Sequence, residues 1–248
     1  MNEKTTHFGF KEVAKSEKEG LVGQVFTSVA SKYDLMNDMM SGGIHRLWKR
    51  HFVAASGIHR GNLVLDLAGG TGDIAKLLMP LVGPTGKVII GDINQAMLDV
   101  GHDRMIDAGF YGRFECTQMN AENLPFADNS IDAITMAFGL RNVTNKQQAL
   151  NEMQRVLKPG GKALVLEFSK VNNSLLKTLY NFYSFKVLPE IGHFVANDRD
   201  SYQYLVESIE QHPDQTTLQN MFETAGMELC SYENLSGGIV AIHKGHKI

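Results

Sequence analysis

A glycine-rich segment that follows a short apolar run holds the residues best suited to bind a ligand. It reads Val64-Leu65-Asp66-Leu67-Ala68-Gly69-Gly70-Thr71-Gly72-Asp73 and lies between a predicted strand and a predicted helix. Glycines lack Cβ, so the backbone can turn sharply there and approach a ligand closely. Asp92 ends the next apolar run, about 20 residues further on, where a carboxylate can accept hydrogen bonds from ribose hydroxyls. The pattern predicts a cofactor that contains a nucleoside.

Two classes of cofactor fit this loop. Gly70-Thr71-Gly72 with Ala75 matches the G-x-G-x-x-[GA] pattern of dinucleotide-binding proteins. However, the carboxylate of Asp66 suits the ammonium of a methionine moiety better than a pyrophosphate. Asn120-Ala121-Glu122 follows the third predicted strand, where an amide could bond an adenine edge. These features favour S-adenosylmethionine over a nicotinamide dinucleotide, with a tight turn that binds nothing as the remaining alternative.

The elements that position these residues alternate between short apolar runs and amphipathic segments. The predicted strands are Leu63–Ala68, Lys87–Gly91, Gly112–Gln118, Ile131–Phe138 and Lys162–Phe168, and the predicted helices between them are Asp73–Val82, Asn94–Ala108 and Lys146–Leu157. This alternation is typical of a doubly wound parallel sheet. Lys158-Pro159-Gly160-Gly161 predicts a helix stop followed by a turn.

Two further strands end the chain. Met227–Leu235 and Gly238–His243 flank Ser236-Gly237-Gly238, which predicts a hairpin. Five parallel strands followed by a hairpin are the plan of the class I methyltransferases. We therefore predict an α/β, Rossmann-like fold with a mostly parallel seven-stranded sheet and a C-terminal antiparallel hairpin.

The remaining segments read as helices. Residues 1–60 are predicted to form a helical N-terminal cover of the active site, with helix-like apolar spacing over Val25–Met40. Residues 61–248 would form the methyltransferase domain, with 170–212 as a helical insertion on the acceptor side. Helices are predicted at Asn173–Leu188, with Ser174 as N-cap, at Tyr202–Glu210 and near Thr216–Ala225.

Composition excludes several classes of function. The 248 residues carry a formal net charge of −3, so no basic field favours a nucleic-acid partner. Cys116 and Cys230 stand alone, outside any Cys or Cys/His cluster. No apolar run approaches the roughly 18 residues of a membrane span, and the polar N-terminus has no signal core. We predict a cytoplasmic protein; peripheral contact with the inner face of the cytoplasmic membrane stays open.

Two longer motifs resemble one specific family. Tyr33-Asp34-Leu35-Met36-Asn37, with Ser41, His45 and Trp48, is similar to the first signature of the bacterial ubiquinone/menaquinone biosynthesis C-methyltransferases. Arg155-Val156-Leu157-Lys158-Pro159-Gly160-Gly161, with Glu167 and Ser169, is similar to the second. Phe138-Gly139-Leu140-Arg141-Asn142-Val143 and the segment around Tyr204-Leu205 also match, so the resemblance runs from about Phe26 to the C-terminus.

The resemblance implies S-adenosylmethionine as methyl donor, S-adenosylhomocysteine as product, and no metal. It implies prenylated quinols as acceptors, namely demethylmenaquinol and the methoxy-polyprenyl-benzoquinol precursor. Ala137 matches a contact position where relatives often carry serine, so a contact there must use backbone or packing. The predicted cofactor-binding residues are Asp66, Gly70, Thr71, Gly72, Asp92, Asn120, Ala121 and Ala137. A quinone-biosynthesis assembly and a homo-oligomer are left open as partners.

Methylation of a ring carbon requires an activated acceptor. A quinol hydroxyl has a pKa near 10, like tyrosine, and its phenolate form pushes charge onto the ortho carbon. Arg141 and Asn142 follow the fourth predicted strand, where they could stabilise the phenolate or orient a water. Tyr33 and His45 of the N-terminal cover are the other predicted catalytic residues, with His45 as a base near neutrality. Arg141 could instead be a structural ion-pair partner, and His45 a structural hydrogen-bonding group.

The helix predicted over Leu175–Val187 has an apolar face with two interpretations. It could pack on the sheet as an ordinary helix, or it could form a wall for a prenyl tail and a contact with the bilayer. Two other functions stay open from the sequence. One is methylation of an oxygen or nitrogen acceptor, and the other is a non-catalytic subunit that binds the cofactor.

Overall fold

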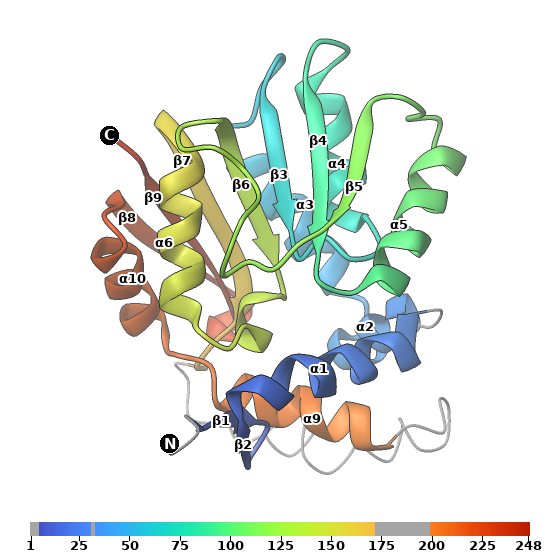
Figure 1. The fold of residues 1–248 in the computed structure, drawn as a ribbon, viewed down its shortest axis with the longest axis vertical. Coiled ribbons are helices and arrows are strands. Elements are labelled where there is room, and N and C mark those ends of the chain that lie inside the picture. The colour runs from blue at the N-terminus through green and yellow to red at the C-terminus, as the bar shows by residue number, and fades with distance from the viewer. Residues whose placement is uncertain (1–4, 31–32, 172–198) are drawn as a thin grey trace.

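The computed structural model describes residues 5–30, 33–171 and 199–248 (Figure 1). Its centre is a seven-stranded sheet in the order β5-β4-β3-β6-β7-β9-β8. The first five of these strands are parallel, and β9 runs antiparallel to both β7 and β8. The strands are β3 (Leu63–Leu67), β4 (Lys87–Asp92), β5 (Phe114–Gln118), β6 (Ile131–Ala137), β7 (Leu157–Phe168), β8 (Glu228–Leu235) and β9 (Val240–His246). The predicted fold class is confirmed.

Both faces of the sheet are buried, which explains why its central strands read as continuous apolar runs. Val64 belongs to the core on one face, whereas Leu65 belongs to the core on the other. The first face packs against α3 (His45–Ala55), α4 (Asp73–Val82) and α5 (Gln95–Asp107). The second face packs against α6 (Lys146–Val156) and α10 (Gln215–Thr224). Alternate side chains of each strand therefore enter different cores.

One prediction at the end of α6 is wrong. The helix stops at Val156 as expected, but Lys158–Gly161 forms no separate turn, because β7 begins at Leu157. The pairing of β6 with β7 shifts register between Ile131 and Ala133, and Gly160 adopts φ +82°. The glycine pair forms a bulge in the strand, where its left-handed backbone costs no Cβ clash.

The N-terminal region contains a hairpin that the sequence analysis missed, made of β1 (Thr5–Phe8) and β2 (Lys11–Ala14). The helix-like apolar spacing over Val25–Met40 falls on two helices, α1 (Lys15–Val29) and α2 (Tyr33–Ser41). Figure 1 shows α1 and α2 grouped with α9 (Arg199–Glu210) at one end of the sheet. The division of the chain at residue 60 stays a prediction.

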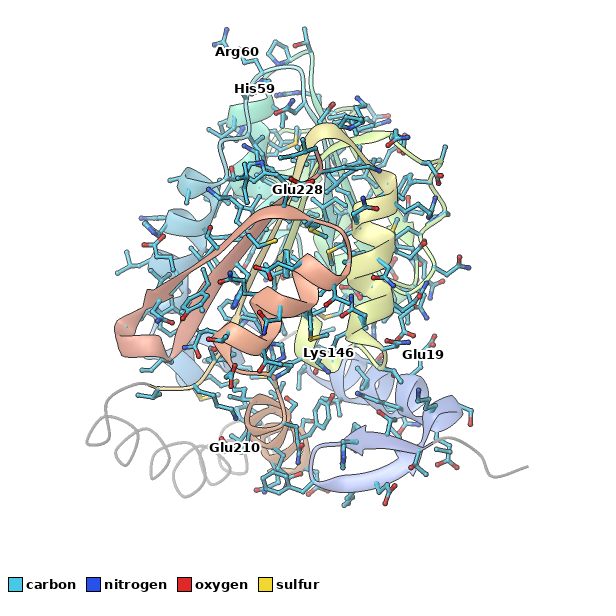
Figure 2. All side chains as sticks on the ribbon, turned by 90° about the vertical axis from the view of Figure 1, so that its left-hand side faces the viewer. Glu19, His59, Arg60, Lys146, Glu210 and Glu228 are labelled. Carbon is cyan, nitrogen blue, oxygen red and sulfur yellow. The ribbon has the colours of Figure 1, made fainter. Side chains whose placement is uncertain are left out.

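The side view in Figure 2 separates the two ends of the sheet. His59 and Arg60 lie at one end, whereas Glu19 of α1 and Lys146 of α6 lie at the other, where the N-terminal helices cover it. That covered end is where β3 and β4 finish, at Leu67 and Asp92. Ligands bind at the carboxyl ends of strands in open α/β sheets.

Three further features of the chain can be compared with the structure only over the described residues. The helix predicted over Asn173–Leu188, with its cap Ser174, lies outside them. Among residues 5–30, 33–171 and 199–248, no helix is long and apolar enough to cross a membrane. Within the same ranges no group of three or more His, Cys, Asp or Glu side chains is arranged to hold a metal ion.

Candidate active site

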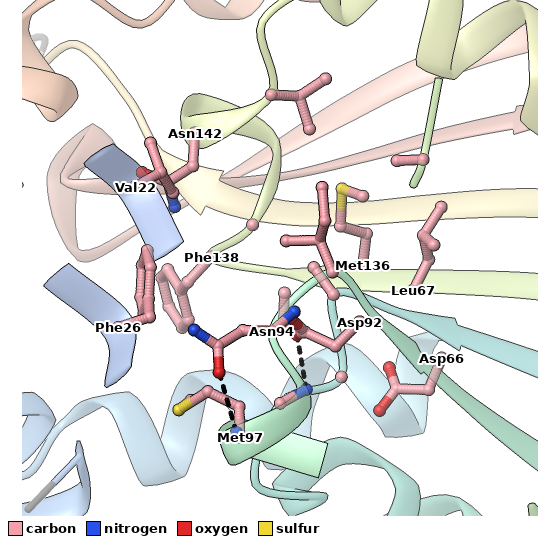
Figure 3. Close-up of a pocket in the computed structure, with 18 of the residues that line it drawn as sticks. Val22, Phe26, Asp66, Leu67, Asp92, Asn94, Met97, Met136, Phe138 and Asn142 are labelled. Atoms are coloured by element: carbon pink, nitrogen blue, oxygen red, sulfur yellow. Dashed lines mark hydrogen bonds between the residues drawn. The ribbon is translucent and has the colours of Figure 1, made fainter. Parts of the chain in front are cut away.

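A pocket opens at the carboxyl edge of the sheet, between the strand ends and α1 (Figure 3). Chain order reverses at β3 and β6, so this is the topological switch point of the sheet. Seven of the eight predicted cofactor residues line it: Asp66, Gly70, Thr71, Asp92, Asn120, Ala121 and Ala137. Gly72 does not line it, but it adopts φ +79° as N-cap of α4 and thereby ends the loop.

The glycine loop is held from behind by a residue that the sequence analysis missed. Gly101 lies in α5, and a Cβ placed on it would lie 2.5 Å from the carbonyl oxygen of Gly70. Only a glycine permits this approach of the helix to the loop backbone. A glycine in the middle of a helix, where it costs helix propensity, is the signal that could have found it.

Asp92 joins the loop to the next helix. Its Oδ2 accepts from the Gly70 amide at 3.0 Å, and its Oδ1 accepts from the Asn94 amide at 2.9 Å. Burial raises the pKa of Asp92 to about 6, and the backbone hydrogen bonds oppose that rise. Its position at the end of β4 and its remaining acceptor capacity suit a pair of ribose hydroxyls.

Asn94 ties α1 to this edge of the pocket. Its Oδ1 caps α5 by accepting from the Met97 amide at 3.1 Å, as Figure 3 shows. Its Nδ2 donates to the Gly23 carbonyl at 3.0 Å and to the Thr27 hydroxyl at 2.9 Å. One side chain therefore positions both a helix of the sheet domain and the helix that covers the pocket.

Asp66 is fully buried in β3 and faces the pocket. Its Oδ1 accepts from the Thr135 hydroxyl at 2.8 Å, and its Oδ2 accepts from the Ala75 amide at 3.1 Å. Burial raises the pKa of Asp66 to about 7, with these hydrogen bonds opposing the shift. A buried carboxylate that lines a pocket is stabilised by a cationic ligand, so Asp66 fits the ammonium of a methionine moiety.

The residues that the sequence predicts to contact the adenine follow β5. Asn120 Oδ1 accepts from the Glu122 amide at 2.8 Å, and its Nδ2 lies 3.4 Å from Glu19 on α1. The amide of Asn120 faces the pocket beside Ala121. Ala137 lines the pocket at the end of β6, where its methyl group offers only packing. These groups fit the cofactor that the resemblance implies.

Arg141 is buried and is not among the residues that line the pocket. Its Nη1 donates to Glu167 Oε1 at 2.8 Å and to the Phe138 carbonyl, and its backbone amide donates to Glu167 Oε2 at 3.1 Å. Both side chains are buried. Burial alone would lower the pKa of Arg141, but the charge of Glu167 and the neighbouring Tyr33 raise it. The geometry matches the ion-pair alternative. Arg141 can then influence the pocket only through its positive charge and through its hydrogen bond to the neighbouring Phe138 carbonyl.

Asn142 lines the pocket one residue further on. Its Oδ1 accepts from the Tyr204 hydroxyl at 3.0 Å, and the Tyr204 ring stacks on Phe8 of the N-terminal hairpin at 4.2 Å. Tyr204 therefore fixes the orientation of the Asn142 amide. The sequence analysis noted Tyr204 only as part of a matching segment, because a contact across 62 residues leaves no local pattern.

The two predicted residues of the N-terminal cover have different positions. Tyr33 lines the pocket, and burial raises its pKa, while the charges of Lys49 and Arg141 lower it. His45 is buried but is not among the lining residues. Its Nε2 forms a hydrogen bond with Asp38 Oδ1 at 2.9 Å. Burial lowers the pKa of His45, and this hydrogen bond opposes that shift. The structure brings Tyr33 to the site with Asn142 and keeps His45 outside it.

Several lining residues were missed because they lie on α1 and α3, far from the glycine loop in sequence. They include Glu19, Gly23 and Phe26 of α1 and Lys49 of α3. Figure 3 shows Val22 and Phe26 entering the view from α1, with Phe138 on the sheet side. Apolar helix residues of this kind are usually interpreted as core in a sequence, and only the packing of α1 over the strand ends shows that they line the pocket.

Comparisons with known proteins agree with this geometry. Residues 11–247 match the model of the ubiE/COQ5 methyltransferase family. The chain is 58% identical over 245 residues to the ubiquinone/menaquinone biosynthesis C-methyltransferase UbiE of Pseudoalteromonas translucida, covering 99% of this chain and 98% of the relative. It is 59% identical over 244 residues to the protein of that name from Marinomonas sp., covering 98% and 97% of the two chains.

Solved structures share the fold at low sequence identity. A methyltransferase from Aquifex aeolicus, described as dependent on S-adenosylmethionine, superposes with a TM-score of 0.64 at 18% identity, covering 87% of this chain and 98% of that one. The likeness shows that the sheet and its helices follow the class I methyltransferase plan. Together with the family match over almost the full length, it leads to one conclusion: the chain belongs to the ubiE/COQ5 methyltransferase family.

Proposed function

We propose that this protein transfers a methyl group from S-adenosylmethionine to a ring carbon of a prenylated quinol in ubiquinone and menaquinone biosynthesis. The family match and relatives near 58% identity, named for this activity, support the reaction. The observation that carries the proposal in the structure is the pocket that brings Asp66, Asp92 and Asn120 together beside Asn142. When bound, S-adenosylmethionine supplies an activated methyl group on its sulfonium.

The bound cofactor would lie along the strand ends in the order of the sheet. Asn120 and Ala121 after β5 would contact the adenine, and Asp92 at the end of β4 would accept from the ribose hydroxyls. The loop backbone at Gly70, Thr71 and Gly72 would lie against the middle of the bound cofactor. Asp66 of β3 would bind the ammonium, and Ala137 of β6 would pack at the same end.

The acceptor would bind beside Asn142 and Tyr33. Because the Tyr204 hydroxyl donates to Asn142 Oδ1, the amide nitrogen of Asn142 is left to donate to a quinol oxygen. Lys49 and Arg141 lower the pKa of the Tyr33 hydroxyl against the effect of burial. Burial still outweighs these charges and leaves the pKa of Tyr33 raised. For a quinol hydroxyl placed next to Tyr33, the same two positive charges would oppose the effect of burial and so assist ionisation to the nucleophilic phenolate.

Transfer of labelled methyl from S-adenosylmethionine to short-tailed demethylmenaquinol, with the oxidised quinone as control, tests the proposed reaction. We expect label on a ring carbon from the reduced form only, because the quinone has no hydroxyl to ionise. The matching benzoquinol is assayed in parallel. Tight cofactor binding without transfer to either quinol would point to another acceptor or to a non-catalytic role.

We expect S-adenosylmethionine binding to weaken as the pH falls from 8 to 5.5. With a pKa of about 7 for Asp66 and about 6 for Asp92, protons compete with the ligand in this range. Because ligand binding requires the ionised carboxylates, the dissociation constant should rise about 10- to 100-fold. Calorimetry in buffers of different ionisation enthalpy would detect the protons released on binding.

The Asp66→Asn variant is the control for this pH dependence, since it should bind weakly and with a flatter pH profile. In the ligand-free protein, the stability of the fold depends on pH in the opposite direction. Between about pH 4 and 7 these two carboxyls bind more protons in the folded than in the unfolded state. Their contribution to the free energy of unfolding therefore falls as the pH rises. An affinity for S-adenosylmethionine that stays constant from pH 8 to 5.5 would contradict the assignment of Asp66 and Asp92.

Membrane contact, an assembly with other biosynthetic proteins, and a homo-oligomer remain predictions. The apolar helix face on which the membrane prediction depends, Leu175–Val187, lies outside the described residues.

A further inference from the structure

Lys49 is a buried cation that reaches the pocket from α3. Its side chain is 8% exposed and lines the pocket near Asp66 and Asp73. Its Nζ donates to Asp73 Oδ2 at 2.6 Å. An ammonium has three N–H donors, and within the described residues this is the one acceptor bonded to Nζ. A buried cation with donors to spare, at a pocket wall, is suited to bind an anionic group.

The charges around the pocket make Lys49 distinctive. The lining contains the carboxylates of Glu19, Asp66, Asp73, Asp92 and Glu122. Among the described lining residues Lys49 is the one lysine or arginine. An anionic group of a ligand would be repelled along most of this wall and attracted at Lys49. The arrangement thus selects both the position and the orientation of such a group.

The proposed order of the cofactor along the sheet places its amino-acid end near Lys49. With the adenine at β5 and the ribose at β4, the methionine moiety extends to β3 and to the start of α4. Asp66 lies in β3, and Asp73, which holds Lys49, is the first residue of α4. A zwitterionic amino-acid group needs one anionic and one cationic partner, and this end of the pocket offers both.

We propose that Lys49 binds the carboxylate of the methionine moiety, while Asp66 binds its ammonium. The inference rests on the proposed cofactor and deepens it by assigning the group that recognises the amino acid. Asp73 is a positioning residue, because its ion pair directs Nζ at the pocket. Since Lys49 belongs to α3, the carboxylate would also join the N-terminal helices to the glycine loop.

The test compares two ligands that differ only in the carboxylate: S-adenosylhomocysteine and its decarboxylated analogue, which keeps the amine. Their dissociation constants are measured by calorimetry for the unmodified protein and for Lys49→Met. We expect the substitution to weaken S-adenosylhomocysteine binding about 10- to 100-fold and to change binding of the analogue less than about threefold. The unmodified protein should prefer S-adenosylhomocysteine by a similar factor.

Lys87→Met is the matched control. Lys87 begins β4 at the opposite end of that strand from Asp92 and pairs with Glu115, so its loss should leave both affinities unchanged. Lys49→Met should fold, because Asp73 is 32% exposed and keeps Arg104 at 3.5 Å. If circular dichroism shows that it does not, Lys49→Gln gives the same comparison.

Equal weakening of both ligands by Lys49→Met would overturn the proposal and assign Lys49 a structural role. Unchanged affinity for S-adenosylhomocysteine would overturn it too, as would equal binding of the two ligands by the unmodified protein. Because the measurement is binding alone, an absence of quinol methylation would leave it intact. An absence of S-adenosylhomocysteine binding would instead remove the proposed cofactor itself.

Discussion

Arg141→Ala is expected to lower the rate of methyl transfer by about 100-fold or more while changing the affinity for S-adenosylhomocysteine less than about threefold. The guanidinium does not line the pocket, so the cofactor loses no contact. What is lost is a buried positive charge next to Tyr33 and the anchor of the backbone that carries Asn142. Single-turnover rates and calorimetric affinities measure the two effects separately.

The same substitution should also destabilise the protein. This loss of stability must be distinguished from the loss of catalytic rate. Removing Arg141 leaves Glu167 buried without its cation, at a cost of about 3–5 kcal/mol in the free energy of unfolding. The double variant Arg141→Gln with Glu167→Gln removes both charges together and should regain much of that stability. If the double variant also regains the rate, the role of Arg141 is purely structural. Arg113→Ala, which breaks a hydrogen bond to the Gly83 carbonyl, is the control for losing a structural arginine.

Asp92→Ala is expected to weaken S-adenosylhomocysteine binding by about 100-fold or more. The carboxylate would accept from the ribose hydroxyls, and it also accepts from the Gly70 and Asn94 amides. The substitution therefore removes a ligand contact and releases the glycine loop. Calorimetry of the purified variant measures the loss directly.

The exposed Asp103 on α5, the helix that follows β4, provides a control, since Asp103→Ala removes an aspartate that does not line the pocket. Asp92→Asn should fall between the unmodified protein and Asp92→Ala, because its single amide oxygen can replace one acceptor. Asp92 is not the ribose-binding residue if Asp92→Ala binds S-adenosylhomocysteine as tightly as Asp103→Ala does.

Much of the sheet and most of the predicted residues that line the pocket followed from the sequence by itself. The prediction of α4 as Asp73–Val82 is confirmed residue for residue, and β3 to β6 fall within two residues of their predicted limits. Buried parallel strands must be apolar on both faces, and Gly, Asn and Asp at their ends stop them, so the pattern is visible locally. Asp66, Asp92 and Asn120 were each predicted to contact the cofactor, and they line one pocket because the carboxyl ends of parallel strands share one edge.

The tertiary structure alone decided which residues surround that edge from elsewhere. Lys49 lies 24 residues from Asp73, Arg141 lies 26 from Glu167, and Asn142 lies 62 from Tyr204. The hairpin β1–β2 escaped prediction because its strands are four residues long and weakly apolar. His45 fits a catalytic role by residue type, yet α3 directs it to Asp38 instead. Residue types and strand periodicity are local properties, whereas a buried charge acquires its partner only when distant elements pack.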